Sequence, residues 1–186
     1  MAKTELTKQI EDALMAWGPT FFAGSKVDPN RDGICAKEVP IELEGSSRSY
    51  VDYACVRECY VTDTKIDTII ACVSIIVSIE DLHNLRECDI CGHCNYYAMP
   101  KALYAKAKDE IPEDIGVLLY YDGTEGSFCG IRKKKECVPH KLDAETQKCL
   151  IMSIAKRATK ELRAAIVAKE KQDRYDRWHS TRNAKY

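Results

Sequence analysis

The sequence has no long apolar run, almost no net charge and no internal repeat, and each absence excludes a class of protein. The longest apolar stretch, residues 69–79, is too short to span a bilayer. Because 28 Lys+Arg nearly balance 29 Asp+Glu, the chain is not basic overall. Without repeats it is not a repeat array. The 186 residues, 45% apolar and 31% charged, are instead typical of a globular domain with its own core.

A secreted disulfide scaffold is not expected either, although the chain has ten cysteines. Residues 1–19 are charged and amphipathic, and they contain no apolar segment of the kind that directs export. The chain is also longer than a typical disulfide-stapled module. We therefore expect a cytoplasmic protein whose thiols are free or bound to metal.

The near-neutral total conceals an uneven distribution of charge. Residues 156–186 contain ten basic and four acidic residues, a net charge of +6, which leaves −7 for residues 1–155. An excess of one sign in one segment indicates a local contact with a polyanion, and the alternative is a solvated helix face.

The order of apolar patterns and turn residues predicts an α/β fold in which a mixed β-sheet is flanked by helices. We expect an N-terminal helix in residues 1–18 and an α/β core in residues 34–141. Residues 142–186 are expected to form a basic helical segment that packs on the core and has an end prone to disorder. Helices are predicted over residues 80–91 and 100–110. The predicted strands cover residues 34–43, 49–61, 66–78, 95–99, 115–121 and 127–133.

Across roughly residues 34–135, an ordered series of short stretches resembles the MmcB-like branch of the PD-(D/E)XK nuclease superfamily. The resemblance rests on the order of the stretches, which follow one another without large gaps. They are Lys37-Glu38-Val39, Tyr50-Val51-Asp52-Tyr53, Asp81-Leu82-His83, and residues 72–78, 95–100, 109–112 and 115–123. The resemblance implies a restriction-endonuclease-like core, here followed by a long basic C-terminal helix, and Mg²⁺-assisted phosphodiester hydrolysis.

The family's chemistry needs an acid on one strand and a Glu-x-Lys motif on the next, so that carboxylates hold Mg²⁺ and the lysine stabilises developing negative charge. By the resemblance, Asp52 matches the first acid and Glu38 matches an upstream glutamate. The Glu-x-Lys position holds Ser74-Ile75-Ile76, so a carboxylate and a cation are both missing. We therefore expect Glu38, Asp52, Ser74 and Ile76 to be the remains of a site without nuclease activity.

The alternative is a migrated site that makes the chain an active Mg²⁺-dependent DNA endonuclease of repair type. Neighbouring charged residues would then have to supply both missing groups in the correct geometry. The candidates are Glu80, Asp81, Lys65 and Lys101.

Loss of the metal site would still leave a groove shaped for a duplex, because phosphate binding needs basic side chains rather than a catalytic carboxylate. We therefore expect the partner to be double-stranded DNA. The candidate contacts are Arg48, Arg132, Lys133, Lys134, Lys135, Lys156, Arg157, Lys160 and Arg163. The spacing of the last four places them largely on one side of a helix. Each of them could equally be an ordinary surface cation.

Three thiols and an imidazole lie within seven residues, at Cys88, Cys91, His93 and Cys94. A Cys-x-x-Cys pair is a common half of a structural zinc site. The second half could come from Cys55 and Cys59, from Cys129 or from Cys137, and an iron–sulfur cluster is a further option. The alternative is that these thiols are small core side chains.

Chains that resemble this branch are frequent in phages and mobile elements. The resemblance therefore suggests an anti-defence factor in a bacterial host cell, one that blocks a host defence nuclease such as Cas9 by binding the enzyme, its DNA or both. A protein-interaction module without DNA binding is the remaining alternative. A membrane partner is not expected.

Overall fold

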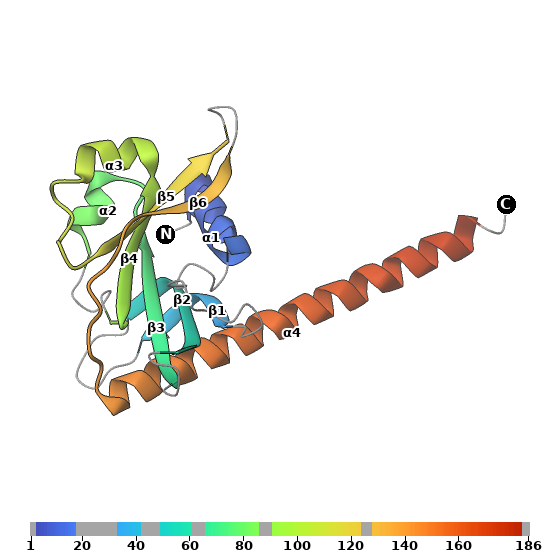
Figure 1. The fold of residues 1–186 in the computed structure, drawn as a ribbon. Helices are drawn as coiled ribbons and strands as arrows, with labels where there is room; N and C mark the ends of the chain where they lie inside the picture. The colour runs from blue at the N-terminus through green and yellow to red at the C-terminus, as the bar shows by residue number, and fades with distance from the viewer. Residues whose placement is uncertain are drawn as a thin grey trace.

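The computed structural model describes residues 3–17, 33–41, 49–60, 66–85, 91–123 and 128–183. Six strands and four helices are found in these ranges (Figure 1). In chain order they are α1 (Glu5–Trp17), β1 (Ile34–Ile41), β2 (Ser49–Tyr60), β3 (Ile66–Ile75), α2 (Ile79–His83), β4 (Cys94–Pro100), α3 (Lys101–Ala107), β5 (Gly116–Asp122), β6 (Cys129–Lys135) and α4 (Ala144–Asn183).

The strands form one mixed sheet in the order β1-β2-β3-β4-β5-β6. The first three strands form an antiparallel meander, β4 and β5 continue parallel to β3, and β6 returns antiparallel to β5. Helical connections precede β4 and β5, as parallel neighbours require a crossover. The predicted α/β class with a mixed sheet flanked by helices is confirmed.

Helices cover both faces of this sheet, so the central strands are buried on both sides. On one face Ile10 and Leu14 of α1 pack against β3, β4 and β5. On the other face Leu150 and Ile154 of α4 cover β1, β2 and β3, while α2 and α3 cover the far end. Alternate residues of β3 therefore enter different clusters, which explains why its sequence is apolar almost without interruption.

The helix predicted over residues 80–91 is confirmed only to His83; residues 84, 85 and 91 are not helical, and residues 86–90 lie outside the described ranges. Ser78 caps the start of α2 in a capping box with Asp81, but the helix ends at His83. Gly92 then lies so close to β3 that a Cβ atom there would stand 3.0 Å from the backbone nitrogen of Cys72. This close approach places the backbone at Gly92 directly against β3, which is distant in sequence.

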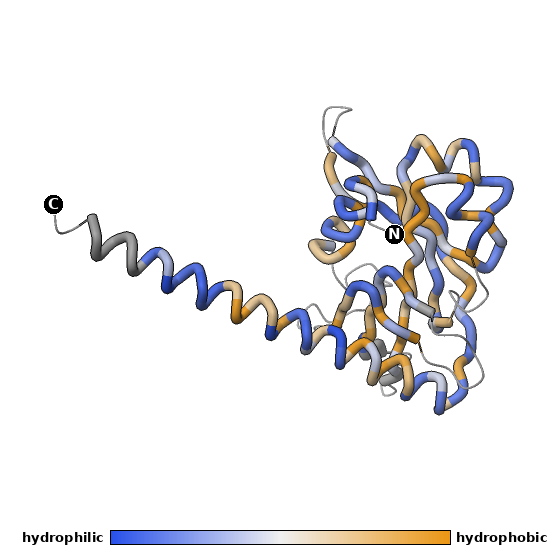
Figure 2. Tube along the Cα trace, turned by 180° about the vertical axis from the view of Figure 1, so that it is seen from behind, coloured by the Kyte–Doolittle hydropathy of each residue, from blue (hydrophilic) through white to orange (hydrophobic). Residues whose placement is uncertain are grey.

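The last helix is continuous and about 60 Å long, given its 40 residues. Asp143 stabilises its start by accepting hydrogen bonds from the backbone N–H groups of Glu145 and Thr146 at 3.0 and 2.9 Å. The first half of α4 packs on the sheet, whereas residues 162–176 are all exposed and extend away from the domain (Figure 1). Figure 2 shows this distal half as mostly hydrophilic, interrupted by one short apolar stretch. None of the helices in the described ranges is long and apolar enough to cross a membrane.

Candidate functional site

Three of the four positions that match the nuclease motif lie side by side across the first three strands. Lys37 pairs with Tyr53 and Val39 with Val51, so Glu38 on β1 faces Asp52 on β2. Tyr53 in turn pairs with Val73, which places Ser74 of β3 next to Asp52. The fold therefore gathers the remains of the expected site at one place, although these residues lie up to 36 positions apart in the sequence.

The side chains at this place are already used in hydrogen bonds or in packing within the domain. Oδ2 of Asp52 accepts a hydrogen bond from the backbone N–H of Ile75 at 2.7 Å. Ser74 is buried, and Ile76 is only 1% exposed in a cluster with Leu82 and Met99. Position 76, where the resemblance would expect a lysine, is thus a core position under α2 rather than part of a polar site.

Glu38 is held by two cations and has an unusual backbone conformation. Its Oε1 lies 2.9 Å from Nζ of Lys3, and its Oε2 accepts a hydrogen bond from Nη2 of Arg157 at 2.7 Å. The hydrogen bond from Lys3 holds the pKa of Glu38 below its ordinary value, with the charge of Arg157 acting in the same direction. Its φ of +49° lies in the left-handed region, which costs about 1–3 kcal/mol for a residue with a side chain. Its paired carboxylate helps to offset that cost.

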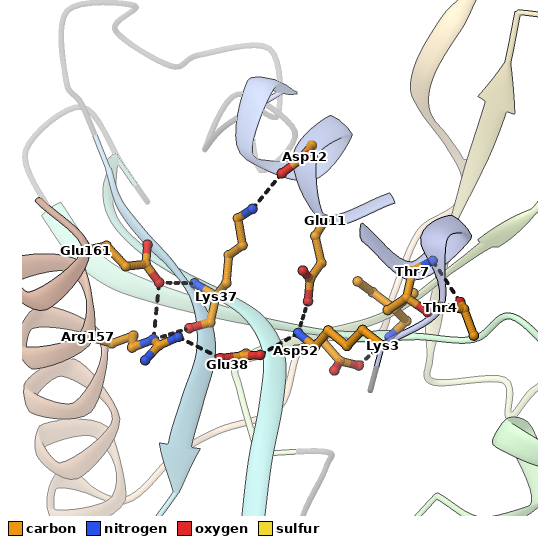
Figure 3. Close-up of polar contacts among 11 residues, drawn as sticks. Lys3, Thr4, Thr7, Glu11, Asp12, Lys37, Glu38, Asp52, Arg157 and Glu161 are labelled. Carbon is orange, nitrogen blue, oxygen red and sulfur yellow. Dashed lines mark hydrogen bonds and ion pairs between the residues drawn. The ribbon is translucent and has the colours of Figure 1, made fainter. Parts of the chain in front are cut away.

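The ion pairs of Glu38 continue into a network that joins α1, β1 and α4 (Figure 3). Lys3 also pairs with Glu11 of α1, and these two hydrogen bonds raise the pKa of Lys3 even though burial alone would lower it. We call this network, together with Asp52, the Glu38 cluster. Its members are Lys3, Glu11, Asp12, Lys37, Glu38, Asp52, Arg157 and Glu161.

Arg157 closes the network on the side of α4. Its Nε donates to the backbone carbonyl of Lys37 at 2.9 Å and lies 3.2 Å from Oε1 of Glu161. Nζ of Lys37 forms an ion pair with Asp12 at 2.6 Å. One arginine thus connects α4 to the edge strand, while Lys37 connects the same strand to α1.

The donor set of the Glu38 cluster does not fit the Mg²⁺ ion that the family resemblance implies. Mg²⁺ needs carboxylate oxygens that can point at it in octahedral geometry. Here the carboxylate of Glu38 is held by Lys3 and Arg157, and Asp52 accepts a backbone N–H group. Five acids against three cations leave the cluster with a charge of about −2, which repels phosphate.

Three of the four basic candidates on α4 share one side of the helix, in agreement with the prediction that they lie largely on one side, and Arg157 lies apart from them. Arg157 turns toward β1 and belongs to the Glu38 cluster. Lys156, Lys160 and Arg163 are exposed on the outer side and line a shallow hollow with Ala155 and Thr159. One position in a helix changes the direction of a side chain by about 100°, so the grouping by sequence neighbourhood fails for Arg157.

Sequence reasoning missed two members of the same outer surface. Lys171 and Arg174 continue the spacing of three and four residues that starts at Lys156, and both are exposed. We call the five cations the basic face of α4: Lys156, Lys160, Arg163, Lys171 and Arg174. They span about 27 Å of helix, and the repeat itself was the pattern that could have revealed them.

The remaining basic candidates lie elsewhere. Arg132 to Lys135 are on β6, at the opposite edge of the sheet from β1, against which α4 packs. There Lys133 pairs with Glu136 at 2.7 Å, and Lys135 donates to the carbonyl of Pro112 at 2.8 Å. Lys134 is exposed, and Arg48 lies outside the described residues.

The candidate residues for a migrated site are not drawn together either. The carboxylate of Asp81 accepts the backbone N–H groups of Val77 and Ser78, so it completes the start of α2. Lys101 stands beside the ring of Tyr121 on β5. Glu80 is exposed on α2, and Lys65 lies outside the described residues.

The cysteine cluster is divided among different neighbours. Sγ of Cys91 lies 3.6 Å from that of Cys72, and Nδ1 of His93 accepts the backbone N–H of Ile70. Cys94 hydrogen-bonds Cys137, and this contact lowers the pKa of Cys137 to about 6.

In the part of the chain that the structure describes, no group of three or more His, Cys, Asp or Glu side chains is arranged to hold a metal ion. Cys88 lies outside that part, so a zinc or iron–sulfur site that includes it stays a prediction.

Comparison with known proteins supports the fold and nothing finer. No family model matches the chain, and no curated protein matches it either. A solved structure of a protein of unknown function from Silicibacter pomeroyi is similar, with a TM-score of 0.57 and 13% sequence identity. The match covers 90% of this chain and 96% of the other. At this identity the likeness concerns the arrangement of helices and strands alone.

Proposed function

We propose that the chain is a catalytically inactive, nuclease-like protein that binds double-stranded DNA along the basic face of α4. The observation that carries the proposal is the division of cations on α4: Arg157 is paired with acids in the Glu38 cluster, whereas Lys156, Lys160 and Arg163 are exposed together around one shallow hollow on the outer side of the helix. Phosphate groups are the polyanion that such a stripe fits best.

The positions of the residues that match the family support the proposal of a nuclease-like fold. The family resemblance requires its first acid on one strand and its Glu-x-Lys motif on the neighbouring strand. Asp52 on β2 and Ser74 near the end of β3 have that relation. The proposed loss of activity is supported by the surroundings of these residues. The carboxylates of Asp52 and Glu38 accept hydrogen bonds within the protein, and Ile76 is buried in the core.

The DNA-binding part is supported by the shape and charge of α4. The basic face projects beyond the domain from Arg163 onward, and its first two lysines lie on the outer side of α4, so a duplex can approach it from the side away from the negatively charged Glu38 cluster. Contacts from lysine and arginine to phosphate carry no sequence information, so we expect binding without sequence preference.

A gel shift with a short duplex tests the DNA-binding part. Replacing Lys160, Arg163 and Lys171 by Gln removes three charges from the basic face. A matched control replaces the exposed Lys106, Lys108 and Lys148 by Gln, which changes the net charge equally at other places. We expect the first variant to lose binding and the control to retain it. Equal loss in both variants would mean that only total charge matters, and the assignment to α4 would be wrong.

A plasmid-cleavage assay with Mg²⁺ or Mn²⁺ tests the proposal that the protein has no nuclease activity. We expect no cleavage from the wild-type protein, because neither carboxylate is available to a metal. Cleavage that the Asp52→Ala variant abolishes would contradict the proposal and would favour the alternative of an active repair endonuclease.

A second candidate function, a protein-interaction module, is favoured by exposed apolar side chains on the same helix. Met152, Leu162 and Ile166 are 49%, 62% and 48% exposed and follow a spacing close to that of a coiled-coil seam. The occupant that fits best is the body of a second copy of this chain, because residues 1–155 carry −7 and attract the +6 of residues 156–186. Sedimentation velocity at low and high salt tests it, and a monomer under both conditions would exclude it.

The narrower role as an anti-defence factor remains a proposal that follows from the family resemblance. It predicts that the purified protein, freed of nucleic acid, forms a complex with an RNA-guided nuclease such as Cas9 or protects DNA from it. Co-elution in gel filtration would support direct inhibition of the enzyme. Protection without co-elution would support competition for the DNA.

A further inference from the structure

Two cysteines face each other across the first two strands of the sheet. Cys35 on β1 is the register partner of Cys55 on β2, and both side chains pack in the cluster that α1 covers. Directly opposite residues in an antiparallel pair have Cα atoms about 4.5–5.5 Å apart, which is within the range that a disulfide spans. The pair is therefore placed for a bridge without a change in strand register.

The two thiols differ in exposure and in acidity. Cys35 lies on the edge strand and is half-buried, whereas the side chain of Cys55 is fully buried. A hydrogen bond with Cys55 lowers the pKa of Cys35, and this effect outweighs burial, which acts in the opposite direction. Because the thiolate is the reactive form of cysteine, Cys35 is suited to attack an oxidant and Cys55 to react with Cys35 afterwards.

The hydroxyl group of Tyr53 completes the surroundings of the pair. Tyr53 lies two residues before Cys55 on β2 and belongs to the same buried cluster. Its hydroxyl is buried, and no described group stands in good hydrogen-bonding geometry to it. Burial raises the pKa of Tyr53, and negative charge on Cys35 or Cys55 raises it further, so the phenol keeps its proton beside these sulfur atoms. This donor is suited to bond an oxygen atom added to Cys35.

The close pair Cys72 and Cys91 lacks both properties that make Cys35 reactive. The two Sγ atoms lie 3.6 Å apart, but both residues are buried. The hydrogen bond with Cys91, together with burial, raises the pKa of Cys72, so its sulfur stays protonated near neutral pH. Two thiols that lie close together are thus not sufficient, and an acidic, half-buried thiol distinguishes the pair on β1 and β2.

We propose that Cys35 and Cys55 are a peroxide-sensitive thiol pair that closes to a disulfide between β1 and β2. The thiolate of Cys35 attacks hydrogen peroxide: an S–O bond forms, the O–O bond breaks, and the leaving hydroxide takes up a proton. Cys35 is then a sulfenic acid, oxidised by two electrons, and the peroxide is reduced to water. The sulfur of Cys55 next attacks that of Cys35: the S–S bond forms, the S–O bond breaks, and the hydroxyl group leaves as water with the thiol proton of Cys55.

The bridge fixes the edge strand on which α4 packs. Arg157 of α4 bonds the carbonyl of Lys37 and the carboxylate of Glu38, both on β1. A disulfide between Cys35 and Cys55 closes a loop of about 20 residues, so it restricts the unfolded chain and stabilises this edge of the sheet. The inference is independent of DNA binding, because it uses no residue of the basic face of α4.

Peptide mapping of the full-length protein tests the proposal. The reduced protein is treated with hydrogen peroxide, the remaining thiols are alkylated in denaturant, and the digest is analysed by mass spectrometry without reduction. We expect a peptide that joins Cys35 to Cys55 and that dithiothreitol separates, while Cys72 and Cys91 are alkylated. Absence of this peptide after treatment that oxidises other cysteines, or a bridge that forms only when peroxide acts in denaturant, would overturn the proposal.

Variants separate the pair from the other cysteines. Cys55→Ala should stop the reaction at the sulfenic acid of Cys35, which dimedone labels. Tyr53→Phe should slow formation of the bridge by about threefold or more, because a hydrogen-bond donor is lost. The exposed Cys129 lies at the opposite edge of the sheet, and Cys129→Ser is the matched control that should leave the rate unchanged. Dimedone on other cysteines but not on Cys35, or equal slowing by the control, would contradict the assignment.

Thermal melting tests the consequence for the fold. The oxidised wild-type protein should melt about 5 °C higher than the reduced protein, because the bridge restricts the unfolded chain. The Cys35→Ser variant, treated with peroxide in the same way, should show no such rise. Equal melting temperatures of the bridged and the reduced wild-type protein would mean that the disulfide does not stabilise the edge strand.

Discussion

The Glu38 cluster and the basic face of α4 use the same types of charged side chain, partly on the same helix, but their charges meet different partners. Arg157 points inward and is shared among Glu38, Glu161 and a backbone carbonyl. Its neighbours Lys156 and Lys160 point outward, next to Arg163. The comparison indicates that a cation of α4 stabilises the fold where acids surround it, and that it stays exposed to solvent where it lies on the outer side of the helix.

The largest expected effect comes from placing a lysine at position 76, where the family resemblance would expect one. Ile76→Lys places an ammonium where the side chain is 1% exposed, so we expect a loss of stability of about 3 kcal/mol or more. Chemical denaturation measures it, with Ile76→Val as a control that should cost about 1 kcal/mol. A mild effect of Ile76→Lys would mean that this position can still open toward the Glu38 cluster.

A truncation separates the basic face of α4 from the Glu38 cluster and has the next largest expected effect. Removing residues 164–186 deletes Lys171 and Arg174 but leaves the Glu38 cluster intact. Because residues 162–176 are exposed, we expect the melting temperature to change by about 2 °C or less. The DNA affinity should fall by about one to two orders of magnitude as two phosphate contacts are lost. A large fall in melting temperature would show that the distal helix supports the fold.

Replacing Arg157 tests the contribution of the Glu38 cluster to stability. Arg157→Ala leaves a carbonyl and two carboxylates without their common donor, so we expect a loss of stability of about 1–3 kcal/mol. The exposed Lys160→Ala is the matched control, with a change expected to stay within about 0.5 kcal/mol. Urea denaturation of both variants measures the difference. Equal stability of the two variants would mean that the network around Glu38 contributes nothing to the fold.

The smallest expected effect is a dependence on pH. The pKa of Glu38 is lowered below its ordinary 4.5, so its stabilisation is present above pH 4.5 and is lost as the pH falls through the folded value. The pKa of Lys3 is raised above 10.5, so its contribution is present below that pH and is lost as the pH rises through the folded value.

Glu38→Gln tests this dependence. We expect it to cost about 0.5–1 kcal/mol at pH 7, because the side chain is 46% exposed, and less at pH 3, where more of the carboxylate is protonated. Urea denaturation at both pH values gives the measurement. A cost that is the same at both pH values would show that the charge of Glu38 is not what stabilises the cluster.

The sequence predicts elements whose pattern is local, and it fails where distant segments determine the outcome. The near-continuous apolar run of β3 predicts a central strand, and the fold confirms it. The helix expected over residues 80–91 ends at His83 among the described residues, and the contact of Gly92 with β3 is one that no local pattern reveals. The candidate site divides in the same way. Periodicity predicts the outward direction of Lys156 and Lys160, but the meeting of Lys3, Glu38 and Arg157 depends on the folded sheet.

The salt dependence of DNA binding tests the central claim most directly. The anisotropy of a labelled 20-base-pair duplex is measured with the wild-type protein from about 50 to 300 mM salt. If the five cations of the basic face contact phosphates, the logarithm of the binding constant should fall against the logarithm of the salt concentration with a slope of about −4 to −5. Absence of binding at the lowest salt, or a slope near zero, would contradict the account.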